Sequence, residues 1–307
     1  MQKILVATEK PFAKAAVDGI KNVATAAGME VVLLENYSSV EELLAAVKEV
    51  DAMIVRSDKV TAEVVAAAEN LKIVVRAGAG FDNLDLNAMT AKGIVGMNTP
   101  GQNSNAVAEL AIAMMIFMAR GQFSGASGSE ISGKTLAIHA YGNVGRLVGK
   151  AGKALGMNVI AYDPFVSDKS IFIGDGVVEV ASVEELYSKA DYLSLHIPAT
   201  PQTKGSIGYE LAMSMPKGAT IVNTARKEVI SEEGLLKAMT ERTDLKYISD
   251  VAPDTKADFE AAAGKRFFAT PKKMGAQTAE ANINAGIAAA EQIVGFLKEG
   301  ITKFKLN

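Results

Sequence analysis

The sequence has no cysteine and only two histidines. Without cysteine, the chain cannot form a disulfide, a thiolate zinc site or a catalytic thiol. Two histidines leave little with which to build a metal centre, and we expect no metal. An excess of positive charge is also lacking, because 32 lysines and arginines stand against 35 aspartates and glutamates, a net charge of −3. The basic surface of a nucleic-acid-binding protein is therefore not expected.

Long hydrophobic runs are missing as well. The longest, Leu110–Ala119, is about half of the 18 or more residues that a membrane-spanning helix requires. The first segment, Met1–Ala7, contains too few apolar residues for the core of a signal peptide and is typical of a strand. We therefore expect no membrane partner and a cytoplasmic location.

The remaining composition is that of an ordinary globular protein. A length of 307 residues is enough for two domains at roughly 150 residues each. Short apolar runs alternate with amphipathic segments of helical length, and a segment rich in glycine and serine, Gly121–Gly133, separates two such series. This alternation predicts an α/β protein with two doubly wound parallel sheets. The predicted strands include Ile4–Ala7, Val31–Leu34, Ala52–Val55, Ile73–Val75, Thr135–His139, Asn158–Tyr162, Tyr192–Ile197 and Thr220–Asn223.

A dinucleotide-binding loop is predicted between the strand Thr135–His139 and the helix that follows it. The segment Ala140-Tyr141-Gly142-Asn143-Val144-Gly145 is similar to the pattern G-x-G-x-x-G, with alanine at its first position. The helix N-terminus and the close backbone approach at Gly142 suit a pyrophosphate. Asp163 follows Gly145 by 163 − 145 = 18 positions, near the spacing of the acid that binds the adenosine ribose. Because a carboxylate there repels a 2′-phosphate, NAD is favoured over NADP.

Further motifs are distributed over almost the whole chain. They are Val55-Arg56-Ser57, Arg76-Ala77-Gly78-Ala79-Gly80, Asn98-Thr99-Pro100-Gly101, His196-Ile197-Pro198 with Thr203, Asn223-Thr224-Ala225-Arg226, Asp250-Val251 and Gly275-Ala276-Gln277-Thr278. Together they resemble the D-isomer-specific 2-hydroxyacid dehydrogenase family, and within it a subgroup of short phosphoglycerate dehydrogenases. The resemblance implies NAD-dependent oxidation of D-3-phosphoglycerate to 3-phosphohydroxypyruvate, the first step of the phosphorylated route to serine.

The resemblance also implies a domain organisation. Two Rossmann-like domains with a cleft between them are expected, a substrate-binding domain of residues 1–97 plus 284–307 and an NAD-binding domain of residues 98–283. The apolar helix Asn105–Arg120 is expected in the interface of a homodimer, and a core helix within one chain is the alternative. The place of a final amphipathic helix, Glu280–Lys298, does not follow from the sequence alone.

Two residues are expected to carry the chemistry. Arg226 follows a predicted strand in the asparagine-x-x-arginine context of the family, and its guanidinium can bind a carboxylate and polarise a carbonyl. Most of the family places a histidine two residues before the Gly275-Ala276 pair, where this chain has Lys273, and the helper glutamate after Asp250-Val251 is missing. A lysine can exchange the proton when desolvation or nearby cations lower its pKa. Whether Lys272 or Lys273 faces the substrate stays open.

The remaining candidates bind substrate or cofactor by resemblance. Arg56 and Arg76 would hold the substrate's phosphate, and the backbone of Gly78-Ala79-Gly80 would hold its carboxylate. The cofactor would contact the glycine loop and Asp163, and also His196, Pro198, Thr203, Thr224, Ala225, Asp250 and Gly275. Two other functions remain open: a sister enzyme that acts on glyoxylate, hydroxypyruvate or D-lactate, and a catalytically weak NAD(H)-sensing scaffold.

Overall fold

The computed structural model describes residues 1–307, which form two compact units. Unit 1 consists of Met1–Asn103 and Gln277–Asn307, and unit 2 of Ser104–Ala276. The first boundary lies 103 − 97 = 6 residues later than expected, because the turn after the last strand of unit 1 stays with that strand. The second lies 284 − 277 = 7 residues earlier, because the final helix is continuous from Ala279 and all of it belongs to unit 1.

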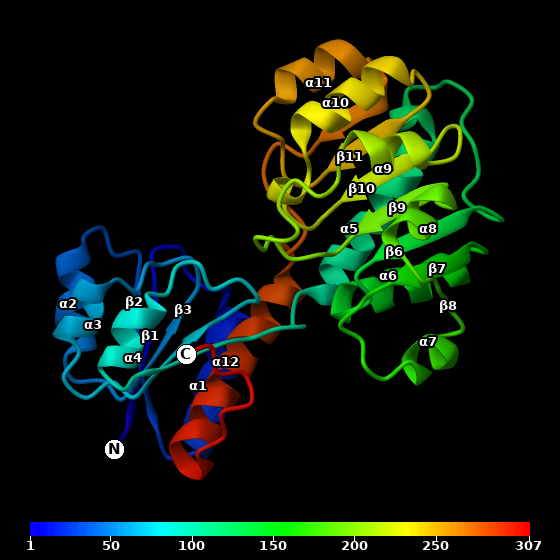
Figure 1. The fold of residues 1–307 in the computed structure, drawn as a ribbon. Helices are drawn as coiled ribbons and strands as arrows, with labels where there is room; N and C mark the ends of the chain where they lie inside the picture. The colour runs from blue at the N-terminus through cyan, green and yellow to red at the C-terminus, as the bar shows by residue number, and fades with distance from the viewer. The chain divides into compact units, whose positions relative to one another are not determined.

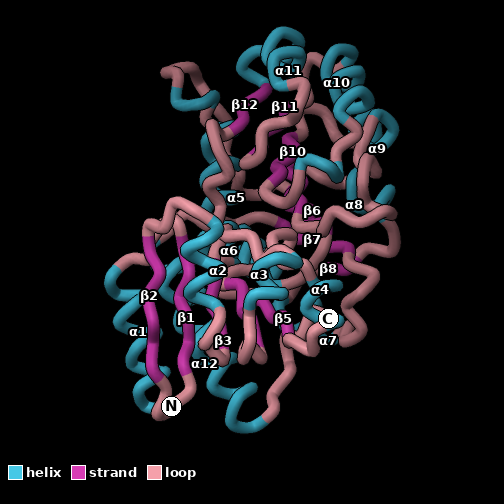
Figure 2. The backbone as a smooth tube through the Cα atoms, turned by 90° about the vertical axis from the view of Figure 1, so that its left-hand side faces the viewer, coloured by secondary structure: helices cyan, strands magenta, loops and turns pink.

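Unit 1 contains a parallel five-stranded sheet with the strand order β2-β1-β3-β4-β5 (Figures 1 and 2). Its strands are β1 (Lys3–Thr8), β2 (Glu30–Glu35), β3 (Ala52–Val55), β4 (Ile73–Arg76) and β5 (Val95–Asn98). Its helices are α1 (Lys14–Ala26), α2 (Val40–Val47), α3 (Ala62–Ala67), α4 (Leu86–Ala91) and α12 (Ala279–Glu299).

Helices cover both faces of this sheet because side chains of a strand alternate between its faces. Ile4 and Val6 of β1 lie in the core beneath α1 and α12, whereas Leu5 and Ala7 lie in the core beneath α2, α3 and α4. The helices α1 and α12 pack side by side, although they come from opposite ends of the sequence (Figure 1). The final helix, which the sequence left without a place, is therefore part of the core of unit 1.

Unit 2 contains a parallel seven-stranded sheet with the order β12-β11-β10-β9-β6-β7-β8. Its strands are β6 (Thr135–His139), β7 (Asn158–Tyr162), β8 (Val178–Glu179), β9 (Tyr192–Leu195), β10 (Thr220–Asn223), β11 (Lys246–Ser249) and β12 (Phe267–Ala269). Its helices are α5 (Ser104–Ala119), α6 (Asn143–Ala154), α7 (Ser170–Asp175), α8 (Val183–Ser188), α9 (Tyr209–Ser214), α10 (Glu232–Glu241) and α11 (Lys256–Ala263), with short 3₁₀ turns at Gly121–Phe123, Lys227–Val229 and Gly264–Arg266.

Both faces of the second sheet are covered in the same way. The cores contain residues of α5, α6 and α7 on one face and of α8, α9, α10 and α11 on the other. The two sheets confirm the predicted fold class of doubly wound, Rossmann-like α/β units. No helix of the chain combines the length and the apolar character needed to cross a membrane.

Candidate active site

In doubly wound sheets, ligands bind outside the carboxyl ends of the strands where the strand order reverses. This switch point lies between β1 and β3 in unit 1, and between β6 and β9 in unit 2. The loop Ala140–Gly145 follows β6, and His196 follows β9. In unit 1, Glu9 follows β1 and Arg56 follows β3. The fold therefore places predicted site residues at the switch point of each unit.

The glycine loop of unit 2 has three positions with different requirements. Ala140 has φ = 78°, a conformation that favours glycine, so its alanine is strained where the pattern has its first glycine. At Gly145, an added Cβ would lie 2.3 Å from the Ala140 carbonyl oxygen, so close packing of α6 requires a glycine. At Gly142, an added Cβ would meet no protein atom within 4 Å. Nothing in the chain requires glycine there, and the open space beside the start of α6 fits a phosphate group.

Asp163 lies just past the carboxyl end of β7 and is 8% exposed. One of its carboxylate oxygens accepts from the Tyr141 amide at 2.8 Å, and the other accepts from the Phe165 amide at 2.9 Å. The carboxylate therefore fixes the glycine loop, while its further lone pairs can accept from ribose hydroxyls. The side chain of Tyr141 is buried and stacks on Phe172, so only the backbone of Tyr141 can contact a cofactor.

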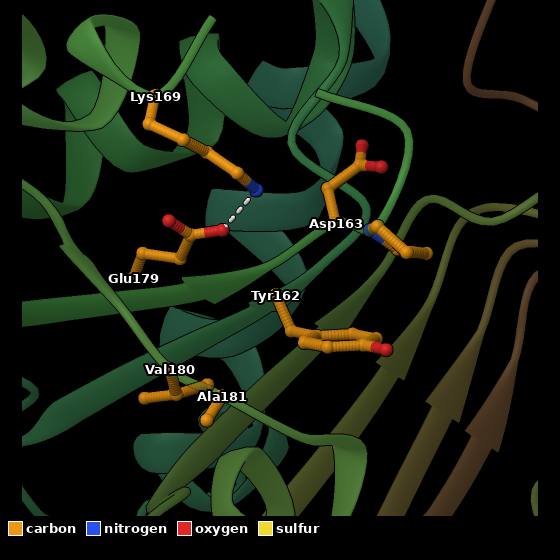
Figure 3. Close-up of a pocket in the computed structure, with 7 residues that line it drawn as sticks. Tyr162, Asp163, Lys169, Glu179, Val180 and Ala181 are labelled. Atoms are coloured by element: carbon orange, nitrogen blue, oxygen red, sulfur yellow. Dashed lines mark hydrogen bonds and ion pairs between the residues drawn. The ribbon is translucent and has the colours of Figure 1, made fainter. Parts of the chain in front are cut away.

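A pocket of about 460 Å³ opens beside Asp163, at the carboxyl ends of β7 and β8 (Figure 3). Within it, Lys169 and Glu179 form an ion pair, so the three charged residues of the pocket sum to one negative charge. An uncharged ribose suits this balance better than a phosphate ester does. The lining residues are Tyr162, Asp163, Pro164, Lys169, Glu179, Val180 and Ala181.

The two histidines of the chain flank the switch point of unit 2. Burial lowers the pKa of His139 to about 4, against the opposing effect of the Asp163 charge, and its Nδ1 lies 3.2 Å from the Tyr187 hydroxyl. Burial and the neighbouring His139 lower the pKa of His196 to about 3. The Nε2 atom of His196 lies 2.9 Å from the Ser194 hydroxyl. Both rings are therefore neutral near pH 7, and neither is placed as a charged group.

Two threonines that we predicted beside the cofactor differ in their environment. The hydroxyl of Thr203 lies 2.8 Å from the Thr200 amide and 2.5 Å from the Pro198 carbonyl oxygen, so it holds its own loop. Thr224 is 6% exposed, and its buried hydroxyl has no hydrogen-bond partner in the protein. Burial without a partner is unfavourable for a hydroxyl. Thr224, next to the buried Ala225, is therefore the threonine that fits a contact with a bound group.

Arg226 is placed by Asn223, the last residue of β10. The buried Asn223 amide accepts from the Ala225 amide at 3.0 Å and donates to the Arg226 carbonyl oxygen at 3.0 Å. The partly exposed Arg226 side chain donates from Nη1 to the Ala225 carbonyl oxygen at 2.9 Å. Asn223 stands in the motif that we quoted, but its positioning role did not follow from the sequence, because it depends on the turn after β10.

Asp250, predicted as a cofactor contact, is fully buried at the carboxyl end of β11. Its carboxylate accepts from the amides of Met274 at 2.7 Å and Gly275 at 2.8 Å, and from the Thr270 hydroxyl at 3.1 Å. These bonds fix both ends of the short loop that carries Lys272 and Lys273. Both lysine side chains are exposed.

The candidate anion site of unit 1 lies at the carboxyl ends of β3 and β4. The Nε atom of Arg76 donates to the Arg56 carbonyl oxygen at 3.0 Å, which joins the two arginines. Gly78 has φ = 144°, and a Cβ there would lie 1.6 Å from Nη1 of Arg76, so only glycine fits beneath this side chain. The Ala79 carbonyl oxygen accepts from Asn98 at 2.6 Å, which holds the loop that continues to Gly80.

Comparison with known proteins finds relatives that act on 2-hydroxy or 2-oxo acids, as their names state. Residues 106–272 match the model described as D-isomer specific 2-hydroxyacid dehydrogenase, NAD binding domain. The D-3-phosphoglycerate dehydrogenase of Methanocaldococcus jannaschii is 38% identical over 282 residues, which are 87% of this chain and 53% of that protein. The hydroxypyruvate reductase of Thermotoga maritima is 36% identical over 271 residues, which are 82% of this chain and 87% of that protein.

A solved structure is similar over the full length. The NAD⁺-bound 3-phosphoglycerate dehydrogenase of Entamoeba histolytica is 49% identical, covers 100% of this chain and 98% of its own, and superposes with a TM-score of 0.87. By contrast, the chain spans only about half the length of the curated 3-phosphoglycerate dehydrogenases of Methanocaldococcus jannaschii and Mycobacterium bovis, at 53% and 50%.

Proposed function

Because the chain belongs to the D-isomer-specific 2-hydroxyacid dehydrogenase family, we propose that it catalyses the NAD-dependent oxidation of D-3-phosphoglycerate to 3-phosphohydroxypyruvate. This reaction is the first step of the phosphorylated route to serine. The observation that carries the choice of substrate is the joined pair Arg56 and Arg76 at the strand ends of unit 1. A phosphorylated 2-hydroxy acid has a second anionic group that needs such cations, and an unphosphorylated one does not.

The cofactor site is formed by unit 2. The amides at the start of α6 and the open space at Gly142 would hold the pyrophosphate, and Asp163 would accept from the adenosine ribose. The unpartnered hydroxyl of Thr224 would donate to the cofactor near its reactive end. Bound NAD supplies the hydride acceptor of the reaction.

Arg226 and Lys273 would perform the chemistry at the substrate. The guanidinium of Arg226 would bind the carboxylate and polarise the oxygen on the carbon that becomes the carbonyl. The amine of Lys273 would take the proton from the substrate hydroxyl. Since the chain leaves this lysine exposed, the bound molecules themselves would exclude water from it and lower its pKa.

A homodimer is part of the same proposal. An apolar groove of about 290 Å³ runs between α5 and α6, and Ile112, Ile116 and Leu147 line it. Apolar surface of this kind is stabilised when a second copy covers it. Sedimentation equilibrium tests this point: the wild-type chain should form dimers, and an Ile112→Glu variant should shift toward the monomer.

The function is tested by NADH oxidation with 3-phosphohydroxypyruvate, compared with hydroxypyruvate, glyoxylate and pyruvate. The proposal predicts a kcat/KM that is largest for the phosphorylated acid. A preference for hydroxypyruvate would favour the reaction for which the Thermotoga maritima relative is named. NADH binding without turnover of any of these acids would instead favour an NAD(H)-sensing scaffold.

A further inference from the structure

The loops at the carboxyl end of the unit 1 sheet are joined at one buried carboxylate, that of Asp58. Asp58 is 6% exposed and lies three residues past the end of β3. One oxygen accepts from the Glu9 amide at 2.7 Å and from the Tyr37 hydroxyl at 2.8 Å, and the other accepts from the Arg56 amide at 3.3 Å. The segments that follow β1, β2 and β3 therefore meet at this side chain, on the switch point of the sheet.

The backbone at Asp58 also reaches the segment that follows β4. The side-chain amide of Asn83 donates to the Asp58 carbonyl oxygen at 2.7 Å and to the Arg56 carbonyl oxygen at 3.3 Å. That Arg56 oxygen is the one to which Nε of Arg76 donates at 3.0 Å. A displacement of Arg56 and Asp58 would thus move both arginines of the candidate anion site.

The side chain of Arg56 is held on several sides. Its Nη1 donates to the carbonyl oxygens of Lys10 at 3.1 Å and Pro11 at 3.3 Å, and its Nη2 donates to Asn282 at 2.8 Å. The guanidinium also lies over the Phe12 ring, 5.1 Å from its centre. A guanidinium has five donors, and these contacts leave some of them for an anion. The orientation of this guanidinium depends on the relative position of the segments after β1 and β3. The hydrogen bond from the Glu9 amide to Asp58 holds these two segments together.

Charge couples the same residues. Burial lowers the pKa of Arg56, and the negative charge of Asp58 opposes this shift and favours the guanidinium. Burial and the hydrogen bond to Asp58 raise the pKa of Tyr37, so Tyr37 stays a donor to the carboxylate. The carboxylate is stabilised by backbone and hydroxyl donors. Asp58 thus acts on Arg56 through both geometry and charge.

We propose that Asp58 is a positioning residue for substrate recognition: its carboxylate joins the segments after β1, β2 and β3, so that Arg56 and Arg76 are oriented toward an anionic phosphate ester. Asp58 itself does not touch the substrate. The proposal rests on the proposed function, since it assumes that these two arginines bind the phosphate.

Asp58→Asn is the primary test. The amide keeps the volume and one acceptor oxygen, but it places N–H donors where a carboxylate oxygen accepts from the Arg56 amide. We expect KM for 3-phosphohydroxypyruvate to rise about tenfold, the size of one weakened hydrogen bond to a charged group. We expect kcat/KM for hydroxypyruvate and the dissociation constant of NADH to stay within about twofold, so the preference for the phosphorylated acid falls.

Two further variants separate positioning from general stability. Tyr37→Phe removes one donor to Asp58 and should lower the same preference by a smaller factor, about threefold. Asp51→Asn is the matched control, because Asp51 also accepts from a backbone amide, that of Lys3 at 2.9 Å, but at the opposite end of β3. Asp51→Asn should leave the preference unchanged, because Asp51 lies away from the switch point; a change equal to that of Asp58→Asn would overturn the proposal.

A double mutant decides whether Asp58 acts through Arg56. In an Arg56→Ala background, Asp58→Asn should cost much less kcat/KM for the phosphorylated acid than it does in the wild type, because only Arg76 is left for it to orient. Additive losses, or an unchanged preference in Asp58→Asn alone, would overturn the role of Asp58 and leave the proposed function standing. A wild-type enzyme with no preference for the phosphorylated acid would overturn the substrate assignment, and the role of Asp58 with it.

Discussion

The switch points of the two units are built from different groups. In unit 1, charged side chains of the chain itself bridge the ends of β1 and β3: Arg56 donates to Lys10, and Asp58 accepts from the Glu9 amide. In unit 2, β6 is followed by a glycine loop with open space at Gly142, and neutral histidines lie on both sides. One switch point thus presents cations fixed by internal bonds, and the other presents backbone amides.

This difference matches two kinds of ligand group. A pyrophosphate is large and is bound well by amides at a helix N-terminus, which requires that side chains stay out of the way. A phosphate ester or a carboxylate is small and is bound well by an oriented guanidinium, which requires that the arginine be held. The two sheets share an architecture, and the residues at their strand ends determine which group each unit can bind.

The largest expected effect concerns the residue that transfers the proton, which we place in unit 2. Lys273→Ala should lower kcat by about 10² to 10⁴, the range for loss of a general acid–base group, while the dissociation constant of NADH stays unchanged. Lys272→Ala is the matched control, because both side chains are exposed on the loop that Asp250 fixes. Steady-state kinetics and a fluorescence titration with NADH measure the two quantities. If the large loss appears in Lys272→Ala instead, the base is Lys272.

Acid should weaken unit 2 through a mechanism that unit 1 lacks, because both histidines lie in unit 2. The folded pKa of His139 is about 4, below its ordinary value of 6.5. Between these values the unfolded chain binds a proton that the folded ring does not, so stability is complete above pH 6.5 and falls as the pH drops toward 4. Between pH 7 and pH 5, His139 alone should lower the free energy of unfolding by about 2 kcal/mol.

Hydrogen exchange at β6 and β9, corrected for the intrinsic rate, measures this loss as a lower free energy of opening. His139→Gln should flatten the pH dependence, although it removes the contact with Tyr187 and lowers stability at pH 7. The strands of unit 1 serve as the internal control. If β1 and β3 lose as much protection as β6, or if the variant keeps the full pH dependence, the histidine is not the cause.

The next prediction tests whether Asp163 contributes to cofactor binding in unit 2. Asp163→Asn keeps one acceptor but sets an amide donor against the backbone N–H of Tyr141 or Phe165, so both the glycine loop and the ribose contact suffer. The dissociation constant of NADH should rise about tenfold. Asp168→Asn is the control, since Asp168 accepts from the Ser170 amide at 3.0 Å on the exposed side of the same segment. Equal affinities in the two variants would remove Asp163 from the cofactor site.

The sequence predicts the fold of this molecule better than it predicts the contacts within the site. Alternating apolar runs located four strands of each sheet, because parallel strands are buried on both faces and their hydrophobic signal is local. The runs did not locate β5, β8, β11 or β12. The place of α12 was not predictable, since it packs on α1 from the other end of the chain. Packing between distant segments leaves no periodic signal in either one.

For the site, spacing pointed to Asp163, and the family resemblance pointed to Asp250 and Arg226. Neither indicated which groups hold these side chains in place. Asp250 accepts from amides 24 and 25 residues away, and Asp58 accepts from an amide 49 residues away. Such bonds depend on which strand ends are neighbours in the sheet, which only the folded topology determines. Asp58 had one local signal, its place two residues after Arg56, and that signal alone does not distinguish a buried carboxylate from an exposed one.

The smallest expected effect concerns strain in the glycine loop. Ala140 has φ = 78°, in the region where glycine is favoured, and no other residue of this loop has a positive φ. Ala140→Gly should relieve strain of about 1 to 2 kcal/mol, partly offset by the greater freedom of glycine in the unfolded chain, for a net gain of about 0.5 to 1 kcal/mol. Urea denaturation measures it, and Ala137→Gly within β6 is the control that should instead destabilise the protein. A loss of stability in Ala140→Gly would mean that the alanine methyl contributes packing that outweighs its strain, and that the departure from the glycine pattern is favourable in this fold.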